Sequence, residues 1–208
     1  ICEQGNTCSL ETGLEATYQA MTLGLRDYVN KNGFPGVILG MSGGIDSALS
    51  AAVAVDALGS DRVHCVMMPS PYTSEESLED AAVAANMLGV KIDTVPIGPA
   101  MDAFDEMLLD HFKGSKAGIT EENIQSRSRG LTLMALSNKL GAMVLSTGNK
   151  SEMSVGYATL YGDMCGGYSV LKDVYKMTVF ELSKWRNKFR PNGALGPVGA
   201  VMPERIIS

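Results

Sequence analysis

The stretch GVILGMSGGIDSALSAAVAV, from Gly36 to Val55, places a strand, a glycine-rich turn and a helix in direct succession. Residues 37–41 form an almost uninterrupted apolar run, which is typical of a parallel strand covered on both faces. Residues 45–58 are mostly small or apolar and are followed by Gly59, which predicts a helix. A strand that leads directly into a helix is the repeating unit of α/β proteins, so the rest of the chain should repeat it.

The same alternation is visible along the rest of the chain. Apolar runs predict further buried strands at 64–69, 91–97 and 142–147. Helical spacing or capping signals predict helices at 13–31, 73–88, 102–112, 120–140 and 178–185. The expected N-caps are Thr73 with Glu76, Thr120, and Thr178 with Glu181. Residues 148–175 and the tail 190–208 are rich in Gly or Pro and are predicted as loops. The pattern predicts an α/β fold, a Rossmann-like doubly wound parallel sheet in a three-layer α/β/α arrangement.

Bulk composition narrows the class of protein. The 208 residues are 45% hydrophobic and 19% charged, which favours one globular domain, expected at 13–208 after a linker or arm at 1–12. The net charge of -6 and the pI of about 4.9 argue against a general nucleic-acid-binding protein. No apolar run reaches the roughly 20 residues that span a bilayer, and residues 1–15 do not resemble a secretory signal. The cysteines form no C-x-x-C pair, which favours reduced thiols in the cytoplasm over a zinc site: Cys2, Cys8, Cys65 and Cys165.

The SGGIDS turn has the features of a phosphate-binding loop. Gly43 and Gly44 allow a sharp turn and a close approach of backbone N–H groups, and the following helix presents its positive end. Ser42 and Ser47 are expected to add hydroxyl donors. The string lacks the lysine of a Walker A loop and is not a G-x-G-x-x-G motif. A carboxylate at Asp46 would repel phosphate unless a cation lay between them, so Asp46 predicts Mg²⁺. The alternative is a tight strand–helix turn without a ligand.

This turn resembles the PP-loop of the N-type ATP pyrophosphatases, which cleave ATP between its α- and β-phosphates. The resemblance implies an adenine nucleotide alpha hydrolase-like fold and ATP contacts along the whole loop: Gly40, Met41, Ser42, Gly43, Gly44, Ile45, Asp46 and Ser47. Members of that group include synthetases of NAD, GMP, asparagine and argininosuccinate, and tRNA-thiolating enzymes. The loop alone does not choose among them.

Four motifs in the second half resemble the NAD⁺ synthetase family, and most closely the synthetase half of its glutamine-dependent form. They are TEENIQSRSRG (120–130), STGNKSE (146–152), GYATLYGD (156–163) and VLKDVYK (170–176), within a resemblance that spans about residues 18–208. The resemblance implies contacts to deamido-NAD from Asn123, Arg127, Arg129, Glu152 and Asp163. It also implies contacts to ATP from Thr147 and Lys176, catalytic roles for Asp46 and Lys176, and Mg²⁺ held by Asp46 and Glu152.

Some of these residues can also be interpreted from their positions in the sequence. Asn123 and Arg127 are four residues apart and share a helix face, whereas Arg129 points elsewhere, so the two arginines should serve different groups or simply lie on a solvated face. Met177 stands where relatives often have Thr, which puts one hydroxyl contact to phosphate in doubt.

The resemblance implies that ATP adenylates deamido-NAD and that ammonia then displaces AMP to give NAD⁺. Glutamine-dependent relatives carry an amidase domain that supplies the ammonia; this chain is expected to lack that domain and a C-terminal segment. A homodimer is implied, with 13–31 and 120–140 as candidate interface helices. The alternatives are a tRNA-modifying or GMP synthetase-type PP-loop enzyme, or a nucleotide sensor without catalysis. The acidic pI and unpaired cysteines disfavour the tRNA enzyme, and a sensor has no reason to keep Asp46, Glu152 and Lys176 together.

Overall fold

The computed structural model describes residues 12–116 and 118–208, which form a parallel sheet between two layers of helices. The strands are β1 (Val37–Gly40), β2 (Val63–Met67), β3 (Lys91–Thr94), β4 (Met143–Ser146) and β5 (Tyr168–Ser169). The longer helices are α1 (Gly13–Lys31), α2 (Ile45–Leu58), α3 (Glu75–Leu88), α4 (Gly98–Leu108), α5 (Ile119–Leu140) and α7 (Lys176–Lys188). Shorter ones are the 3-10 helix η1 (Ser60–Arg62), α6 (Lys150–Val155) and α8 (Glu204–Ile207).

The sheet has the strand order β3-β2-β1-β4-β5, and all four pairings are parallel. Chain order therefore reverses direction between β1 and β4, with β1 at the centre. In open α/β sheets, ligands bind in the crevice outside the carboxyl ends of the strands at such a switch point. The predicted α/β, doubly wound, three-layer fold is confirmed.

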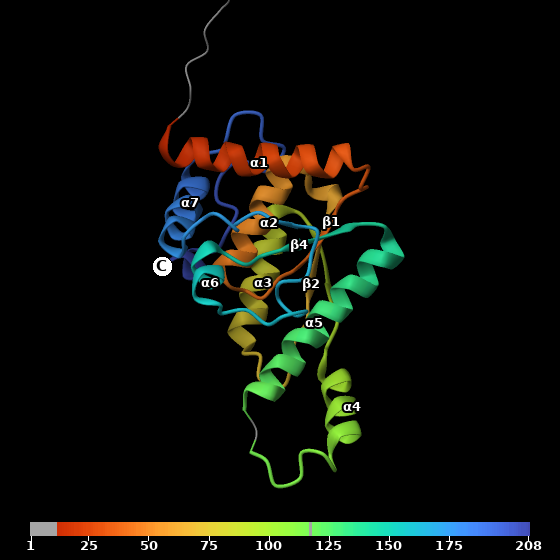
Figure 1. Cartoon of the computed structure of the whole chain (residues 1–208). Coiled ribbons are helices and arrows are strands. Elements are labelled where there is room, and N and C mark those ends of the chain that lie inside the picture. The colour runs from red at the N-terminus through yellow and green to blue at the C-terminus, as the bar shows by residue number, and fades with distance from the viewer. Residues whose placement is uncertain (1–11, 117) are drawn as a thin grey trace, which may run out of the picture.

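Alternate residues of the strands face two separate cores. Val37 and Leu39 belong to the larger core, which lies under α1, α2, α3 and α7. Ile38, between them, belongs to a smaller core under α4 and α5, as the two-residue period of a strand requires. In Figure 1, α1 runs across the top, α7 lies at the left below it, α5 crosses the lower right, and α4 with the loop after it stands out at the bottom.

The small residues of α2 place this helix in the interior. Nearly every residue from Ile45 to Leu58 is buried, and α1, α3 and α7 all pack around it. Its C-terminal half carries a buried carboxylate, Asp56, which binds Arg186 of α7 and accepts a hydrogen bond of 2.7 Å from the Tyr18 hydroxyl. Burial raises the pKa of Tyr18 well above its ordinary value of 10.0, and the Asp56 charge adds to the shift, so the hydroxyl remains a donor.

Helix starts were the weakest sequence predictions. Thr73 does not cap α3; the cap is Ser74, whose hydroxyl accepts from Ser77 N–H at 3.2 Å, while Thr73 closes the preceding turn. Thr120 lies inside α5, because Gly118 donates its N–H to the Glu121 carboxylate instead.

The start of α7 is also earlier than predicted, and this matters for the site. Thr178 lies inside the helix, which begins at Lys176 with Tyr175 as N-cap. The Tyr175 side chain makes no capping hydrogen bond. Instead, the Lys176 N–H donates to the Ser151 hydroxyl at 3.0 Å. A contact between distant segments thus replaces the local cap that the sequence suggested, and it puts Lys176 on the first turn.

Other elements differ in extent or were missed. Helix α4 begins four residues before the predicted 102, since Pro99 fits the first turn of a helix. The strand predicted at 91–97 ends at Thr94, two residues before Pro96, which has no N–H to donate. Short elements α6, β5 and α8 lie in segments predicted as loops. Residues 1–11 of the expected arm, with Cys2 and Cys8, lie outside the described residues. Among the described helices, none combines the length and hydropathy that crossing a bilayer requires.

Candidate functional site

The residues predicted for ATP and Mg²⁺ lie at the carboxyl ends of β1 and β4, two neighbouring strands between which the chain order reverses. The glycine loop, residues 41–44, follows β1 and leads into α2. It starts as a continuation of the sheet, because the Met41 N–H still donates to the Val66 carbonyl at 2.9 Å. Residues 147–149 follow β4 in the same way and lead into α6. The topology therefore brings the SGGIDS and STGNKSE motifs together.

Ser42 of the glycine loop and Ser47 of the first turn of α2 stabilise the internal structure of the loop. The buried Ser47 hydroxyl donates to the Gly44 carbonyl at 2.9 Å and accepts from the Ser42 N–H at 3.3 Å. The Ser42 hydroxyl lies 3.1 Å from that of Ser47 and accepts from the Gly44 N–H at 3.2 Å. Ser47 is thus placed to shape the loop, whereas the exposed Ser42 also faces solvent.

Glycine occupies the two positions 43 and 44 of the loop for different physical reasons. Gly43 has φ +83°, and a Cβ there would lie 2.2 Å from the Ser77 carbonyl oxygen, so α3 packs directly against it. Gly44 has φ -89°, and the nearest atom to its Cβ would be the Ser42 hydroxyl at 3.4 Å, which is ordinary contact. Gly44 is the exposed N-cap of α2. Gly43 is therefore required by the fold, and only Gly44 leaves open space in front of the helix N-terminus.

We predict that alanine at position 43 acts mainly on stability and that alanine at position 44 acts mainly on ligand binding. Gly43→Ala should lower the free energy of unfolding by about 2 kcal/mol, from the left-handed backbone and the contact with Ser77. Gly44→Ala should lower it by less than about 1 kcal/mol, because alanine is only a poorer N-cap, yet weaken ATP binding. Urea unfolding and calorimetry measure the two effects. Equal losses of stability in both variants would contradict the assignment of Gly43 to helix packing.

Asp46, the second residue of α2, is the centre of the site. Its Oδ2 forms an ion pair with Lys176 Nζ, and its Oδ1 accepts a hydrogen bond of 2.9 Å from Asn149 Nδ2. Both side chains of the ion pair remain accessible, with 19% of Asp46 and 39% of Lys176 exposed. The centroid of the Phe180 ring lies 5.6 Å from Lys176 Nζ, within the range of a cation–π contact. Lys176 is thus a cation of the protein itself beside Asp46, and the Mg²⁺ that the sequence predicted there stays a prediction.

Asn149 connects Asp46 with Glu152, and sequence analysis missed its role. Its side chain accepts from the Glu152 N–H at 3.1 Å, while its own N–H donates to the Glu152 carboxylate at 2.9 Å. This reciprocal pair is a capping box that starts α6. The spacing of Asn and Glu in NKSE is the usual signal for that motif and could have revealed it. Asn149 is buried, so α6 is fixed to the Asp46 carboxylate.

Asn149→Ala should therefore act on stability and on the site at once. Loss of the cap should cost about 1 kcal/mol, and Asp46 should lose the donor on its Oδ1. We expect a lower midpoint of urea unfolding together with weaker ATP binding. Thr159→Ala is a matched control, since it removes a donor from a loop beyond α6 without touching Asp46. A variant with lower stability but unchanged ATP affinity would show that Asn149 only caps α6.

The donor set at this position is compatible with Mg²⁺. Within residues 12–116 and 118–208, no three or more His, Cys, Asp or Glu side chains form a group that could hold a metal ion. Asp46 and Glu152 nevertheless converge on the same residue, Asn149. Mg²⁺ usually takes one or two carboxylates together with substrate phosphates and water, so two carboxylates beside a phosphate loop fit this ion.

Glu152, one of the residues predicted for deamido-NAD, lies beside Asn149. The other four fall into two groups, and the first holds a loop. This tyrosine loop, residues 156–163, packs on α5. Arg127 Nε donates to the Leu160 carbonyl at 3.1 Å, and Asn123 accepts from the Thr159 hydroxyl at 3.1 Å. The Asp163 carboxylate accepts from the Thr159 N–H at 2.8 Å, so it closes the loop on itself. Asn123, Arg127 and Asp163 thus meet each other through the loop, and among the described residues no hydrogen bond or ion pair joins them to the glycine loop.

The tyrosine loop is exposed and closely packed at its base. Tyr157 and Tyr161 are 79% and 78% exposed, and Tyr161 has φ +64°, a conformation that among the described non-glycine residues it alone adopts. A Cβ on Gly130 of α5 would lie 2.8 Å from the Gly162 carbonyl oxygen, so two glycines allow this approach. The tyrosine loop therefore has a fixed base and presents aromatic side chains to solvent.

Arg129 forms the second group. It lies half-buried on α5, and its Nε donates to the Met68 carbonyl at 3.2 Å, just after β2. Burial lowers the pKa of its guanidinium, since the charged form loses water. No carboxylate among the described residues forms an ion pair with it. A half-buried cation near the carboxyl end of the sheet is suited to an anionic ligand.

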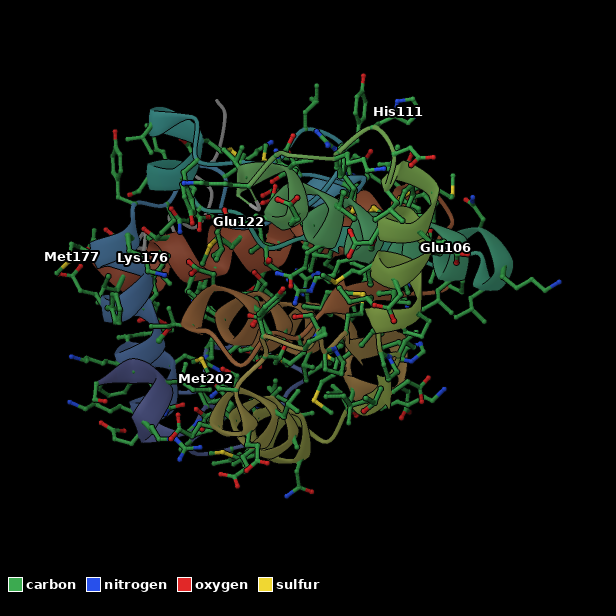
Figure 2. The ribbon with its side chains drawn as sticks, turned by 90° about the horizontal axis from the view of Figure 1, so that it is seen from below. Glu106, His111, Glu122, Lys176, Met177 and Met202 are labelled. Atoms are coloured by element: carbon green, nitrogen blue, oxygen red, sulfur yellow. The ribbon has the colours of Figure 1, made fainter. Side chains whose placement is uncertain are left out.

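Thr147 and Met177 complete the predicted set. Thr147 is partly buried and directly follows β4. Figure 2 shows Met177 at the edge of the molecule beside Lys176, with its side chain directed outward, and 72% of Met177 is exposed. The Met177 thioether therefore takes no part in the ion pair between Lys176 and Asp46.

Comparison with known proteins identifies the family of this chain. The family model for NAD synthase matches residues 17–208, nearly all of the described chain. The chain belongs to the NAD synthase family. It is 55% identical over 194 residues to the glutamine-dependent NAD(+) synthetase of Rhodobacter capsulatus, an alignment covering 93% of this chain and 35% of that relative. The corresponding Thermotoga maritima enzyme is 53% identical over 176 residues, covering 85% of this chain and 31% of that relative.

Solved structures of similar proteins share the fold. The glutamine-dependent NAD+ synthetase from Acinetobacter baumannii, in complex with adenosine diphosphate, has a TM-score of 0.90 and 53% identity. It aligns with 99% of this chain and 38% of its own. The NMN synthetase from Francisella tularensis has a TM-score of 0.80 and 27% identity, over 95% of this chain and 74% of its own. The chain thus spans about a third of the length of the curated relatives it matches.

Proposed function

We propose that this chain carries the synthetase activity of a glutamine-dependent NAD⁺ synthetase. The proposed substrates are ATP, deamido-NAD and ammonia, and the products are NAD⁺, AMP and pyrophosphate. The observation that carries the proposal is the ion pair of Lys176 with Asp46 beside the glycine loop. It occurs in a chain 55% identical to a named synthetase of this kind. None of the relatives named above is a tRNA-modifying or GMP synthetase-type enzyme.

The proposed reaction has two steps. An oxygen of the nicotinate carboxylate attacks the α-phosphorus of ATP, and the bond from that phosphorus to the bridging oxygen of the β-phosphate breaks. Ammonia then attacks the acyl carbon, AMP leaves, and the nitrogen loses a proton to solvent. Neither step requires a covalent bond to the protein, so the protein contributes position and charge.

The residues have distinct parts in this proposal. The open face of Gly44 and the N–H groups at the start of α2 would bind the phosphates of the leaving pyrophosphate. Lys176 would turn from Asp46 toward the same phosphates and balance the charge that develops on them, which its accessibility permits. Arg129 would pair with an anionic group of a substrate, and Asn123, Arg127 and Asp163 would shape the deamido-NAD site through the tyrosine loop.

Mg²⁺, when bound between Asp46, Glu152 and the phosphates, would neutralise part of the phosphate charge. In this arrangement Asn149 keeps the two carboxylates facing one region, since it bonds to both. The protein would thus hold the ion with two carboxylates and leave its remaining positions to phosphate and water.

The identity of the pyridine substrate requires its own test, because a relative at 27% identity is an NMN synthetase. We propose the dinucleotide, since the relatives at 53% and 55% identity are named NAD synthetases. The chain should be incubated with ATP, Mg²⁺ and ammonium, together with either deamido-NAD or nicotinate mononucleotide. AMP, pyrophosphate and NAD⁺ in equal amounts are expected with the dinucleotide. Turnover confined to the mononucleotide would overturn the substrate assignment.

Two further properties belong to the same proposal. Ammonia would come from an amidase domain, as the glutamine dependence of the relatives suggests. A homodimer is proposed through α5, which exposes apolar side chains: Ile119, Leu131, Met134 and Leu140. Helix α1 is a weaker candidate than sequence analysis suggested, because most of its apolar face packs into the core. Sedimentation analysis of wild-type protein and of Leu131→Asp would test the interface.

A further inference from the structure

Helices α2 and α7 are joined by two ion pairs at matching positions. Asp46 and Lys176 meet at the start of the two helices, and Asp56 and Arg186 meet ten positions later on each. Both pairs join residues that are 130 positions apart in the sequence. The two helices therefore run in the same direction with a single register, and the two pairs lie about 15 Å apart along α7.

The two pairs have opposite environments. The first is accessible at the site, whereas both side chains of the second are almost completely buried. Arg186 holds Asp56 with two bonds, from Nε to Oδ2 at 2.6 Å and from Nη2 to Oδ1 at 3.0 Å. The Tyr18 hydroxyl of α1 donates to the same carboxylate. We call Tyr18, Asp56 and Arg186 the Asp56 cluster.

The segment after α7 closes around this cluster. Arg186 also donates to the carbonyls of Pro197 and Gly199, at 2.9 and 3.2 Å. The Leu195 N–H donates to the Asp56 carbonyl at 3.0 Å. A Cβ on Gly196 would lie 2.2 Å from Asp56 Oδ1, so the backbone there contacts the carboxylate directly. These bonds fix the Arg186 guanidinium, and α7 cannot slide along α2 without breaking several of them.

We propose that the Asp56 cluster is a positioning device for Lys176. It fixes the register of α7 on α2 and thereby holds Lys176 Nζ beside the glycine loop. The start of α7 has no side-chain cap and is held through α6, because the Lys176 N–H donates to the Ser151 hydroxyl at 3.0 Å and the Lys150 N–H donates to the Val174 carbonyl at 2.9 Å. The buried end of the helix adds a second constraint on where the accessible end lies. This proposal rests on the proposed function, because its test measures NAD⁺ formation. It assigns a positioning role to residues that do not touch a substrate.

A double-mutant cycle tests the proposal. Arg186→Lys keeps the charge but loses the two-pronged bond to Asp56, and Tyr18→Phe removes one hydroxyl. Changes at sites this far apart normally combine independently, within about a factor of two. If the cluster acts through Lys176, Arg186→Lys should lower kcat for NAD⁺ formation about 10-fold, and Tyr18→Phe about 3-fold. In a Lys176→Ala background, each should change kcat by less than twofold.

Controls separate positioning from stability and from the proposed function. Leu88→Ala, in the core under α3, lowers stability without touching α7 and should leave kcat per folded molecule unchanged. Equal losses from Arg186→Lys with and without Lys176 would overturn positioning, as would Tyr18→Phe with wild-type kcat. If wild-type protein binds ATP but makes no NAD⁺, the proposed reaction fails, and the same cycle measured on ATP affinity by calorimetry decides the positioning role. A chain that neither turns over nor binds ATP overturns both.

Discussion

Lys176→Ala is expected to lower the rate of NAD⁺ formation by about 10²–10³-fold, the usual effect of removing one positioned charge from the developing negative charge of a transition state. The expectation follows from its place on the first turn of α7, beside Asp46 and the glycine loop. The Michaelis constant for ATP should change less than kcat, because the charge on the phosphates grows as pyrophosphate leaves. Steady-state assays of NAD⁺ and pyrophosphate measure both constants.

Lys184→Ala is the matched control for this variant. It removes a lysine from the same helix, at an exposed position two turns beyond the site. Its kinetics should equal those of wild-type protein. A loss of less than tenfold in Lys176→Ala would show that Lys176 serves mainly as the structural partner of Asp46. In that case Asp46→Asn should lower the stability of Lys176-containing protein without a comparable loss of turnover.

Arg186→Ala and Asp56→Ala are each expected to lower the free energy of unfolding by about 3–5 kcal/mol, because each leaves an unpaired charge in the interior. Both side chains of the pair are essentially inaccessible, with 0% and 1% exposed. For a chain of this size, 1 kcal/mol corresponds to about 2–4 °C in Tm, so Tm should fall by roughly 6–20 °C. Urea unfolding and calorimetry give the two quantities.

Removal of both charges is the informative control for that prediction. A double variant, Asp56→Leu with Arg186→Met, should be more stable than either single variant, since an apolar pair leaves no charge unpaired. Its kcat should still be lowered if the cluster positions Lys176. Single variants within about 1 kcal/mol of wild type would contradict a buried, charged pair.

Sequence alone predicted the parts of the molecule that depend on neighbouring residues. The apolar run before the glycine loop and the small residues of α2 gave the central strand and helix, because period and burial are local properties of a segment. Strand and helix alternation then placed the glycine loop and residues 147–149 at one edge of the sheet. In the structure, Asn149 bonds to both Asp46 and Glu152, and Lys176 pairs with Asp46, while the roles assigned to these residues stay predictions.

Long-range contacts account for what sequence alone did not reveal. Ser47 was expected to face a ligand, yet it bonds back to Gly44, and Gly43 is required by a carbonyl of α3. Arg186 looks like a solvated residue near the end of a helix until its partner, 130 positions earlier, is known. The start of α7 was misplaced because Ser151 replaces a local cap. No local pattern records which distant residue will supply a hydrogen bond.

The wide spacing of the partners of Asp46 has a consequence for protein synthesis. Asn149 and Lys176 follow Asp46 by 103 and 130 positions. At translation rates of about 5–20 residues per second, roughly 7–26 seconds pass between the synthesis of Asp46 and the synthesis of Lys176. Throughout that interval the nascent chain carries the glycine loop without the charge that would act on pyrophosphate. Under the proposed reaction, such a chain lacks the lysine just as Lys176→Ala does, and it should turn over ATP at least as slowly as that variant.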